Sequence, residues 1–287
     1  MLRKLYKKLY RYVFEINNID KLYKFKNIII SFSGGLGAQI FSASIYSFLE
    51  NNNFNVYGDF KYFATNDQIK NKTKGISYWN WQLSDYNIKI SNFKQKNFSF
   101  LYLIFNSYKF INDGDFKLYL AIKSMQNQYS TIFKIDLNRI QNNIDYKLYQ
   151  FLNNSYIALH MRRGDYLNVA SLVIPDKDYI DLLLSMNLVN INLIILSDSE
   201  VESETHALLK QKYKNILIYD NNKLSPFISH VIMTNATYLI CSNSQFSFSA
   251  GLLSNGFVYY PTKWNKEDND YFTKTISQTS HFHIKLN

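Results

Sequence analysis

The chain is organised around one stretch in its second half, which reads Ser155-Tyr156-Ile157-Ala158-Leu159-His160-Met161-Arg162-Arg163-Gly164-Asp165-Tyr166. The first five residues form a short apolar run that predicts a buried strand. The strand delivers a histidine, two arginines and an aspartate into a turn at Gly164, where glycine permits a sharp bend. Adjacent guanidiniums repel each other and resist burial, so this pair requires an anion or carboxylates close by.

Two interpretations of this stretch stay open from the residues alone. A diphosphate would accept hydrogen bonds from both guanidiniums, because the planar fork of arginine matches phosphate oxygens. The stretch is otherwise a surface loop held by an Arg–Asp ion pair. His160 is either a nucleotide contact or a satisfied structural group, and Asp165 is either a general base or the structural partner of an arginine. The tripeptide Arg163-Gly164-Asp165 also matches a cell-adhesion motif, but such a motif requires an exposed extracellular loop.

Composition indicates a globular chain in a reducing compartment. The 287 residues suffice for two domains, and 47% hydrophobic and 17% aromatic content is typical of a packed core. Cys241 is the single cysteine, so no internal disulfide can form. No apolar run approaches the roughly 20 residues that cross a bilayer, and no secretory signal is evident. We therefore expect a cytoplasmic protein.

The net charge of +10 is concentrated near the N-terminus, where residues 1–28 hold eight cations against two carboxylates. Residues 2–16 predict a helix with an apolar stripe opposite a basic one. Such a helix lies either on an anionic membrane surface or on the body of the protein, and we treat residues 1–26 as a separate element. A basic balance favours phosphate-bearing partners. It does not favour nucleic acid here, because the excess charge is not spread along one face.

A βαβ unit is predicted next. A strand over residues 28–32 leads into Ser33-Gly34-Gly35-Leu36-Gly37-Ala38-Gln39, and a helix and a second strand over residues 54–60 follow. Such a turn holds a phosphate or sugar near a helix N-terminus, or is simply a tight turn without a ligand. A dinucleotide site is not favoured, because Ile40 stands where the third glycine belongs. The residues expected to line a cleft are Gly34, Gly35, Gly37 and Gln39.

Residues 60–135 show poor periodicity, and we assign no elements there. Asp113-Gly114-Asp115 is the only metal-like motif in this region. An acidic turn is the simpler explanation of a glycine between two aspartates, so we predict no metal site.

The second half alternates strands with helices, which predicts a parallel, doubly wound α/β sheet. Residues 136–153 are expected to be helical, and the domain boundary is placed near 150. This gives an N-terminal Rossmann-like domain over 27–150 and a C-terminal domain over 151–287. The expected helices cover residues 175–188, 201–213, 225–233 and 245–253, and the expected strands cover residues 191–196, 216–219, 238–241 and 256–260.

Polar loops follow three of these strands, at 160–165, 197–200 and 242–244. Ligands of open parallel sheets bind beyond the carboxyl ends of the strands. The serine-rich loop also precedes a helix, whose N–H groups attract an anion. The sequence therefore predicts a site for a nucleoside diphosphate. Its expected residues are His160, Arg162, Arg163, Asp198, Ser242, Asn243, Ser244 and Phe246.

The chain resembles the bacterial α-1,2-fucosyltransferases of glycosyltransferase family 11. The resemblance rests on segments in the family's order, with a closing segment at Pro261-Thr262-Lys263-Trp264. Three positions differ from the family pattern: Ala38 replaces asparagine, and Phe248-Ser249 stands where the family has a Trp-Trp pair. The main matching segments are residues 33–41, His160 to Tyr166, residues 196–198 and Cys241 to Ser247.

The resemblance implies a GT-B fold, in which two Rossmann-like domains face across a cleft. It also implies GDP-fucose as the donor, a β-galactoside acceptor in a surface glycan, inversion at the anomeric carbon, and no metal or cofactor. Arg162 and Arg163 would then stabilise the leaving diphosphate, and Asp165 is the candidate base. Another GDP-hexose, another acceptor, or a nucleotide-sugar-binding protein without catalysis are the alternatives.

Overall fold

The structure is a computed structural model, and the chain divides into unit 1, Met1–Thr131, and unit 2, Ile132–Asn287. The division does not fall near 150 as predicted, because residues 132–152 pack on the second unit. The side-chain amide of Asn235 donates to the Ile135 carbonyl at 2.7 Å, and that of Asn192 donates to the Phe151 carbonyl at 3.0 Å. The residues that the structure describes are 22, 24–64, 80–86, 88–92, 108–111, 120, 121, 124, 132–168, 172–188 and 190–261.

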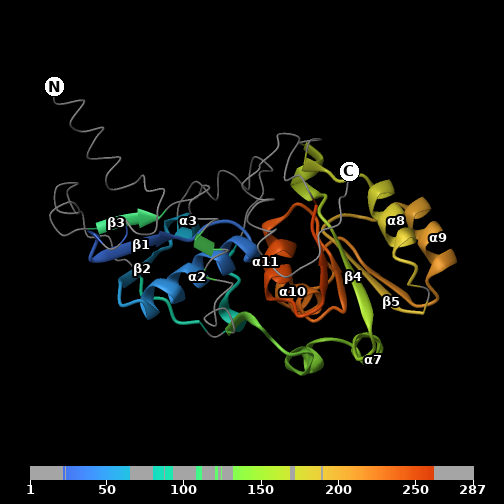
Figure 1. Cartoon of the computed structure of the whole chain (residues 1–287), viewed down its shortest axis with the longest axis horizontal. Coiled ribbons are helices and arrows are strands. Elements are labelled where there is room, and N and C mark those ends of the chain that lie inside the picture. The colour runs from blue at the N-terminus through green and yellow to red at the C-terminus, as the bar shows by residue number, and fades with distance from the viewer. Residues whose placement is uncertain are drawn as a thin grey trace. The chain divides into compact units, whose positions relative to one another are not determined.

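The described part of unit 1 contains a parallel sheet in the order β2-β1-β3 (Figure 1). β1, the helix α2 and β2 form the predicted βαβ unit, and α2 begins within the glycine-containing turn. Leu22 and Phe25 are buried, so the body of this unit begins before residue 27. The described elements are β1 (Asn27–Ser31), α2 (Leu36–Asn51), β2 (Asn55–Asp59), α3 (Lys61–Ala64), the short helix η2 (Ser84–Tyr86) and β3 (Tyr108–Ile111).

Strand β3 lies in the region to which the sequence analysis assigned no element. The polar and apolar residues of β3 do not alternate as its buried and less buried positions do. Lys109 is only 1% exposed and lies on the same face as the buried Ile111. The Lys109 amine lies 5.8 Å from the centre of the Phe25 ring, a cation–π contact. A lysine at a core position hides the period of two that reveals a strand.

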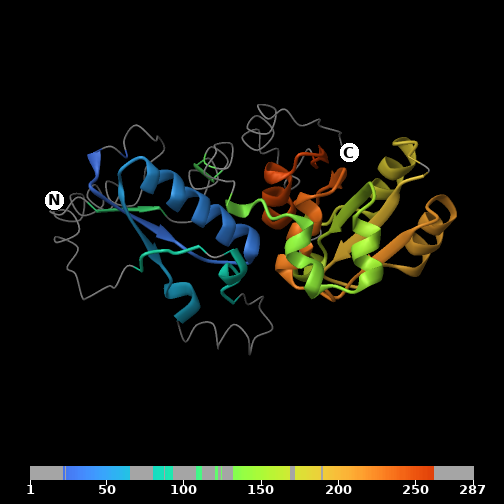
Figure 2. The same cartoon turned by 90° about the horizontal axis from the view of Figure 1, so that it is seen from below.

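Unit 2 contains a parallel sheet in the order β6-β5-β4-β7-β8. Helices α8 and α9 lie on one face of this sheet, and α10 and α11 lie on the other (Figures 1 and 2). The predicted parallel, doubly wound α/β class is therefore confirmed. The elements are η4 (Leu137–Asn143), α7 (Tyr146–Leu152), β4 (Tyr156–Met161), η5 (Gly164–Asn168), α8 (Asp176–Ser185), β5 (Asn192–Ser197), α9 (Ser203–Lys212), β6 (Ile216–Tyr219), α10 (Pro226–Thr234), β7 (Tyr238–Ile240), α11 (Gln245–Leu253) and β8 (Phe257–Tyr259).

The strand order places a topological switch point beside β4. The chain moves outward from β4 to β5 and β6, and then returns to the other side of β4 to form β7 and β8. Every residue of β4 and β5 is buried, as expected for strands covered on both faces. At a switch point the loops after neighbouring strands diverge and leave a crevice, where ligands of such sheets bind. The loops that follow β4 and β7 therefore define the candidate site.

The helices expected over residues 136–153 and 2–16 have different outcomes. Residues 136–153 form two short helices instead of one, because Asp136 and Asp145 each accept a backbone N–H and start a new helix. The predicted basic helix over residues 2–16 lies outside the described residues. Within the described part, no helix has both the length and the apolar character that a bilayer crossing requires.

Candidate functional site

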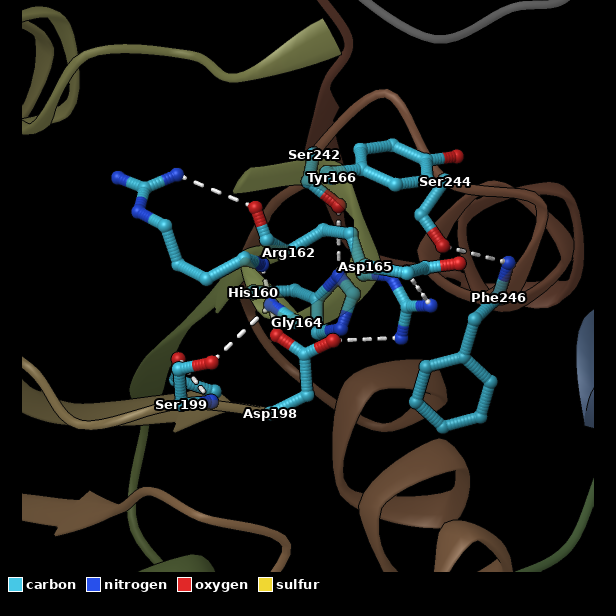
Figure 3. A network of polar contacts seen from close by, with 12 residues as sticks. His160, Arg162, Gly164, Asp165, Tyr166, Asp198, Ser199, Ser242, Ser244 and Phe246 are labelled. Carbon is cyan, nitrogen blue, oxygen red and sulfur yellow. Dashed lines mark hydrogen bonds and ion pairs between the residues drawn. The ribbon is translucent and has the colours of Figure 1, made fainter. Parts of the chain in front are cut away.

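Arg162 lies between two carboxylates just beyond the carboxyl end of β4 (Figure 3). Its Nη1 lies 2.6 Å from Asp198 Oδ2, and its Nη2 forms an ion pair with Asp165 Oδ1. The guanidinium also lies 5.2 Å from the centre of the Tyr166 ring. The Arg162 side chain is 14% exposed, whereas that of Asp165 is 36% exposed. The anionic partner that the sequence required is therefore supplied by carboxylates, of which Asp165 is the more accessible.

Arg163 serves a different set of contacts from its neighbour. Its Nη2 pairs with Asp176, the first residue of α8, and its guanidinium lies 5.8 Å from the centre of the Tyr179 ring. Asp176 Oδ2 accepts a hydrogen bond from Thr205 of α9 at 2.9 Å. The buried Arg163 thus fastens the end of β4 to the two helices on one face of the sheet. The two guanidiniums therefore take separate carboxylate partners, and joint binding of one diphosphate by both arginines stays a prediction.

The turn at Gly164 is fixed by the loop after β5. The backbone N–H of Arg163 donates to Asp198 Oδ1 at 2.6 Å, and that of Gly164 donates to Ser199 Oγ at 3.0 Å. Gly164 has φ +25°, and a Cβ at this position would lie 2.5 Å from Asp198 Oδ2. Only glycine therefore lets Asp198 reach Arg162 and the Arg163 backbone at the same time.

His160 joins β4 to β7 beneath the loops. Its Nδ1 lies 2.8 Å from Ser242 Oγ, its side chain is buried, and its ring packs edge-on against Phe246 with centroids 5.4 Å apart. Burial, reinforced by the positive charges of Arg162 and Arg163, lowers the pKa of His160 to about 3. The imidazole is therefore neutral at physiological pH. The structural alternative for His160 matches this environment.

The loop after β7 uses its polar side chains within the protein. Ser244 caps α11 by accepting the Phe246 N–H at 3.2 Å, and Ser242 Oγ lies 3.3 Å from Ser247 Oγ. Asn243 Nδ2 donates to the Leu172 carbonyl at 2.6 Å. Of the predicted ligand-binding residues, Ser242, Asn243 and Ser244 are buried. Their contribution is to hold the α11 N-terminus beside the end of β4.

The charges at this edge of the sheet nearly balance. Two guanidiniums face three carboxylates, and the partners lie within ion-pair distance. A further anion would meet net negative charge unless one carboxylate moved away. Because Asp165 is the most exposed of the three, it is the carboxylate that water can hydrate most readily when its ion pair opens.

The turn of unit 1 is built differently. Gly34 has φ +73°, and Gly35 is the N-cap of α2, while Gly37 is buried within the helix. Gln39 was predicted to line a cleft, but it is fully buried. Its Nε2 donates to the carbonyls of Gly34 and Asn80 at 2.9 and 2.8 Å, and its Oε1 accepts the Gln82 N–H at 2.8 Å. Gln39 therefore acts as an internal clamp on the turn.

The positions that depart from the family pattern at 248 and 249 belong to the core. Phe248 and Ser249 are both 0% exposed. The Phe248 ring packs edge-on against Tyr260 at 5.2 Å, and Ser249 Oγ lies 3.2 Å from Nε2 of the buried His230. Both side chains therefore contribute to the packing of α11 against its neighbours.

Some contacts at the site were not predicted from the sequence. Asp176 pairs with Arg163, and Ser199 accepts the Gly164 N–H, but neither residue was among the predicted site residues. Asp176 could have been found from the sequence, because it is an acidic residue in the first turn of the helix that follows a basic loop. Asp113 and Asp115 lie outside the described residues. Among the described residues, no three His, Cys, Asp or Glu side chains gather as a metal site would require.

Comparison with known proteins gives structural likeness only. No family model matches the chain, and no curated protein sequence matches it. It is similar to fucosyltransferase NodZ from Bradyrhizobium, with a TM-score of 0.43 and 12% identity over 82% of this chain and 95% of that one. It is similar to E. coli heptosyltransferase WaaC with ADP, with a TM-score of 0.48 and 8% identity over 90% and 93%. POFUT1 in complex with GDP gives a TM-score of 0.41 and 11% identity over 81% and 96%.

Proposed function

We propose that this chain is an inverting glycosyltransferase of GT-B type that transfers fucose from GDP-fucose to the 2-hydroxyl of a β-galactoside in a surface glycan. The observation that carries the proposal is the place of Arg162. Arg162 follows the carboxyl end of β4, next to the switch point of a sheet type that commonly binds nucleotides. The N-terminus of α11 follows β7, the strand that pairs with β4 on that side. Both features favour a bound diphosphate.

The proposed chemistry follows from charge. When the bond between the sugar and the diphosphate breaks, the β-phosphate gains negative charge. Arg162 would stabilise that charge, and losing one such preorganised contact typically raises the barrier by about 3–4 kcal/mol. Asp198 Oδ2 pairs with the Arg162 guanidinium, while Asp198 Oδ1 accepts the Arg163 N–H. The second contact fixes the carboxylate and so helps to orient Arg162. No divalent ion is required for this step in the proposal, and no cofactor beyond the donor substrate.

Asp165 is better suited to the counterion role than to the role of base. It is ion-paired with Arg162, and it is the most exposed carboxylate of the cluster. A diphosphate that displaced the Asp165 carboxylate would take over its ion pair with Arg162. The general base for the acceptor hydroxyl is not among the pairs described above.

The decisive test is incubation with a panel of nucleotide sugars and β-galactosides, with product detection by mass spectrometry. We expect transfer from GDP-fucose, an inverted anomeric centre by NMR, and turnover that persists with a chelator. Arg162→Ala should lower turnover by about two to three orders of magnitude while the protein remains folded. Transfer from a different GDP-hexose would replace the donor assignment. GDP binding without transfer to any acceptor would identify a non-catalytic nucleotide-sugar-binding protein.

The contact of residues 1–20 with a membrane stays a prediction from the sequence. Each cation near an anionic leaflet contributes about 1 kcal/mol. We propose a cytoplasmic protein that binds reversibly to the inner face of the membrane. Co-sedimentation with anionic vesicles should fall as salt rises, and deletion of residues 1–20 should abolish it while transfer to a soluble acceptor continues. Vesicle binding by the shortened protein would contradict this contact.

A further inference from the structure

A pocket of about 330 Å³ lies beside the Arg162 cluster, at the carboxyl ends of β4 and β5. This volume is within the range of small-molecule sites. The wall of the pocket combines apolar side chains with three carboxylates, one guanidinium and two serines. Its polar lining residues are Arg163, Asp176, Ser197, Ser199, Glu200 and Glu202.

The charges of the lining decide what kind of ligand it suits. One cation, Arg163, faces three carboxylates, and it is already paired with Asp176. A phosphate would therefore be repelled from this pocket. Carboxylates act only as acceptors, so Glu200 and Glu202 suit a ligand with several O–H donors. The apolar wall, which includes Met161 and Val201, suits the C–H face of a ring.

We propose that this pocket binds the vicinal diol of a sugar ring, with Glu200 and Glu202 accepting hydrogen bonds from its hydroxyls. The proposal rests on the proposed function, which brings two such rings: the ribose of the nucleotide and the transferred hexose. Strand order favours the ribose. β4 and β5 are the first two strands of this doubly wound sheet, and an acidic residue at the end of the second strand is a known partner of a ribose hydroxyl in such sheets.

The pocket and the Arg162 cluster share one framework. Ser199, which lines the pocket, accepts the Gly164 N–H, and the adjacent Asp198 holds Arg162. One loop, residues 197–202, therefore borders both the cationic site and the hydroxyl-accepting pocket. A nucleotide that placed its diphosphate at Arg162 would meet the pocket with a neutral part of the same molecule.

The test is a cycle of ligand and protein changes measured by calorimetry. GDP and 2′,3′-dideoxy-GDP are titrated into the unaltered protein, Glu200→Gln, Glu202→Gln and Glu204→Gln. Glu204 is exposed on α9 and removes the same charge without lining the pocket. We expect GDP to bind about tenfold more tightly than the dideoxy compound, since hydrogen bonds to charged groups are of that strength. This ratio should fall to about threefold or less in Glu200→Gln or Glu202→Gln, because the amide oxygen accepts more weakly than a carboxylate, and it should persist in Glu204→Gln.

A second arm identifies the ring. If the dideoxy compound binds as well as GDP, the comparison of GDP-fucose with GDP is made in the same variants. A preference for GDP-fucose that Glu200→Gln or Glu202→Gln removes assigns the pocket to the hexose and supports the diol proposal. If neither preference depends on these two glutamates while GDP still binds, the diol proposal is overturned and the proposed function stands. If the unaltered protein binds no GDP, both are overturned.

Discussion

The two sheets end in loops of opposite character. In unit 1, the side-chain amide of Gln39 hydrogen-bonds to the backbone of the turn and of residues 80 and 82, through both its nitrogen and its oxygen. In unit 2, Arg162 and Arg163 are held by carboxylates. Neutral hydrogen bonds to a buried backbone cannot be exchanged without leaving polar groups unsatisfied. An ion pair can be exchanged for another anion, so under the proposed function unit 2 supplies the affinity for a charged ligand, while unit 1 supplies a fixed turn.

The largest expected effect comes from Arg162→Ala, which removes the exchangeable cation. GDP affinity in calorimetry should fall about a hundredfold, the equivalent of about 2.7 kcal/mol. Arg163→Ala should act chiefly on stability, because it leaves Asp176 without its ion pair at a cost of about 3 kcal/mol. Equal losses of GDP affinity in the two variants would show that the neighbouring arginines are equivalent.

Gln39→Ala tests the other side of the comparison. Three hydrogen bonds disappear, and the free energy of unfolding in urea should fall by about 3 kcal/mol. Asn51→Ala is the matched control, since this exposed amide on the same helix donates to the Ser47 carbonyl. Its effect should stay within about 0.5 kcal/mol. A stable Gln39→Ala protein would mean that the turn does not depend on the clamp.

Asp165→Asn examines whether the ion pair is exchangeable. If a diphosphate replaces the Asp165 carboxylate, removal of its charge should tighten GDP binding by up to about fivefold. Asp181→Asn, on the exposed side of α8, changes the net charge equally and should leave affinity unchanged. Weaker binding by Asp165→Asn would instead indicate that this carboxylate contacts the ligand.

The smallest expected effect is on pH dependence, which also belongs to unit 2. Burial lowers the pKa of His160 and of His230 to about 3, from 6.5. As pH falls, both histidines therefore become protonated near pH 6.5 in the unfolded chain but only near pH 3 in the folded protein. The free energy of unfolding consequently decreases as pH falls below 6.5. Between pH 7 and pH 6 each histidine should lower the free energy of unfolding by about 0.7 kcal/mol. Urea titrations at both pH values should show a smaller difference in His230→Gln, and an unchanged difference would contradict a neutral, buried His230.

Much of unit 2 was predictable because its strands are continuous apolar runs that end in polar loops. Arg162 and Asp198 were selected from the sequence on that basis, and the structure brings them together. Which partner each arginine takes was not predictable. Consecutive side chains point to opposite sides of an extended chain, and the carboxylates come from residues 165, 176 and 198.

The errors have physical causes of the same kind. Gln39 is polar, and a polar residue beside a glycine turn suggests ligand contact. Its burial becomes evident only when Asn80 and Gln82, far along the chain, supply partners for its amide. β3 was missed because Lys109 occupies a core position. In both cases a polar side chain is buried by contacts with residues remote in sequence, and local patterns do not report such contacts.

The central place of β4 has a consequence for biosynthesis. One arm of the sheet, β5 and β6, follows β4 directly, but the other arm begins only at Tyr238. While the chain is being synthesised, Arg162 and Asp198 emerge from the ribosome before Ser242 and α11 exist. The nascent chain thus exposes one bare edge of β4, where His160 has not yet met Ser242. An unpaired strand edge is prone to pairing with other strands, so we expect the nascent chain to be most exposed to wrong strand pairing while residues 162–240 are being added.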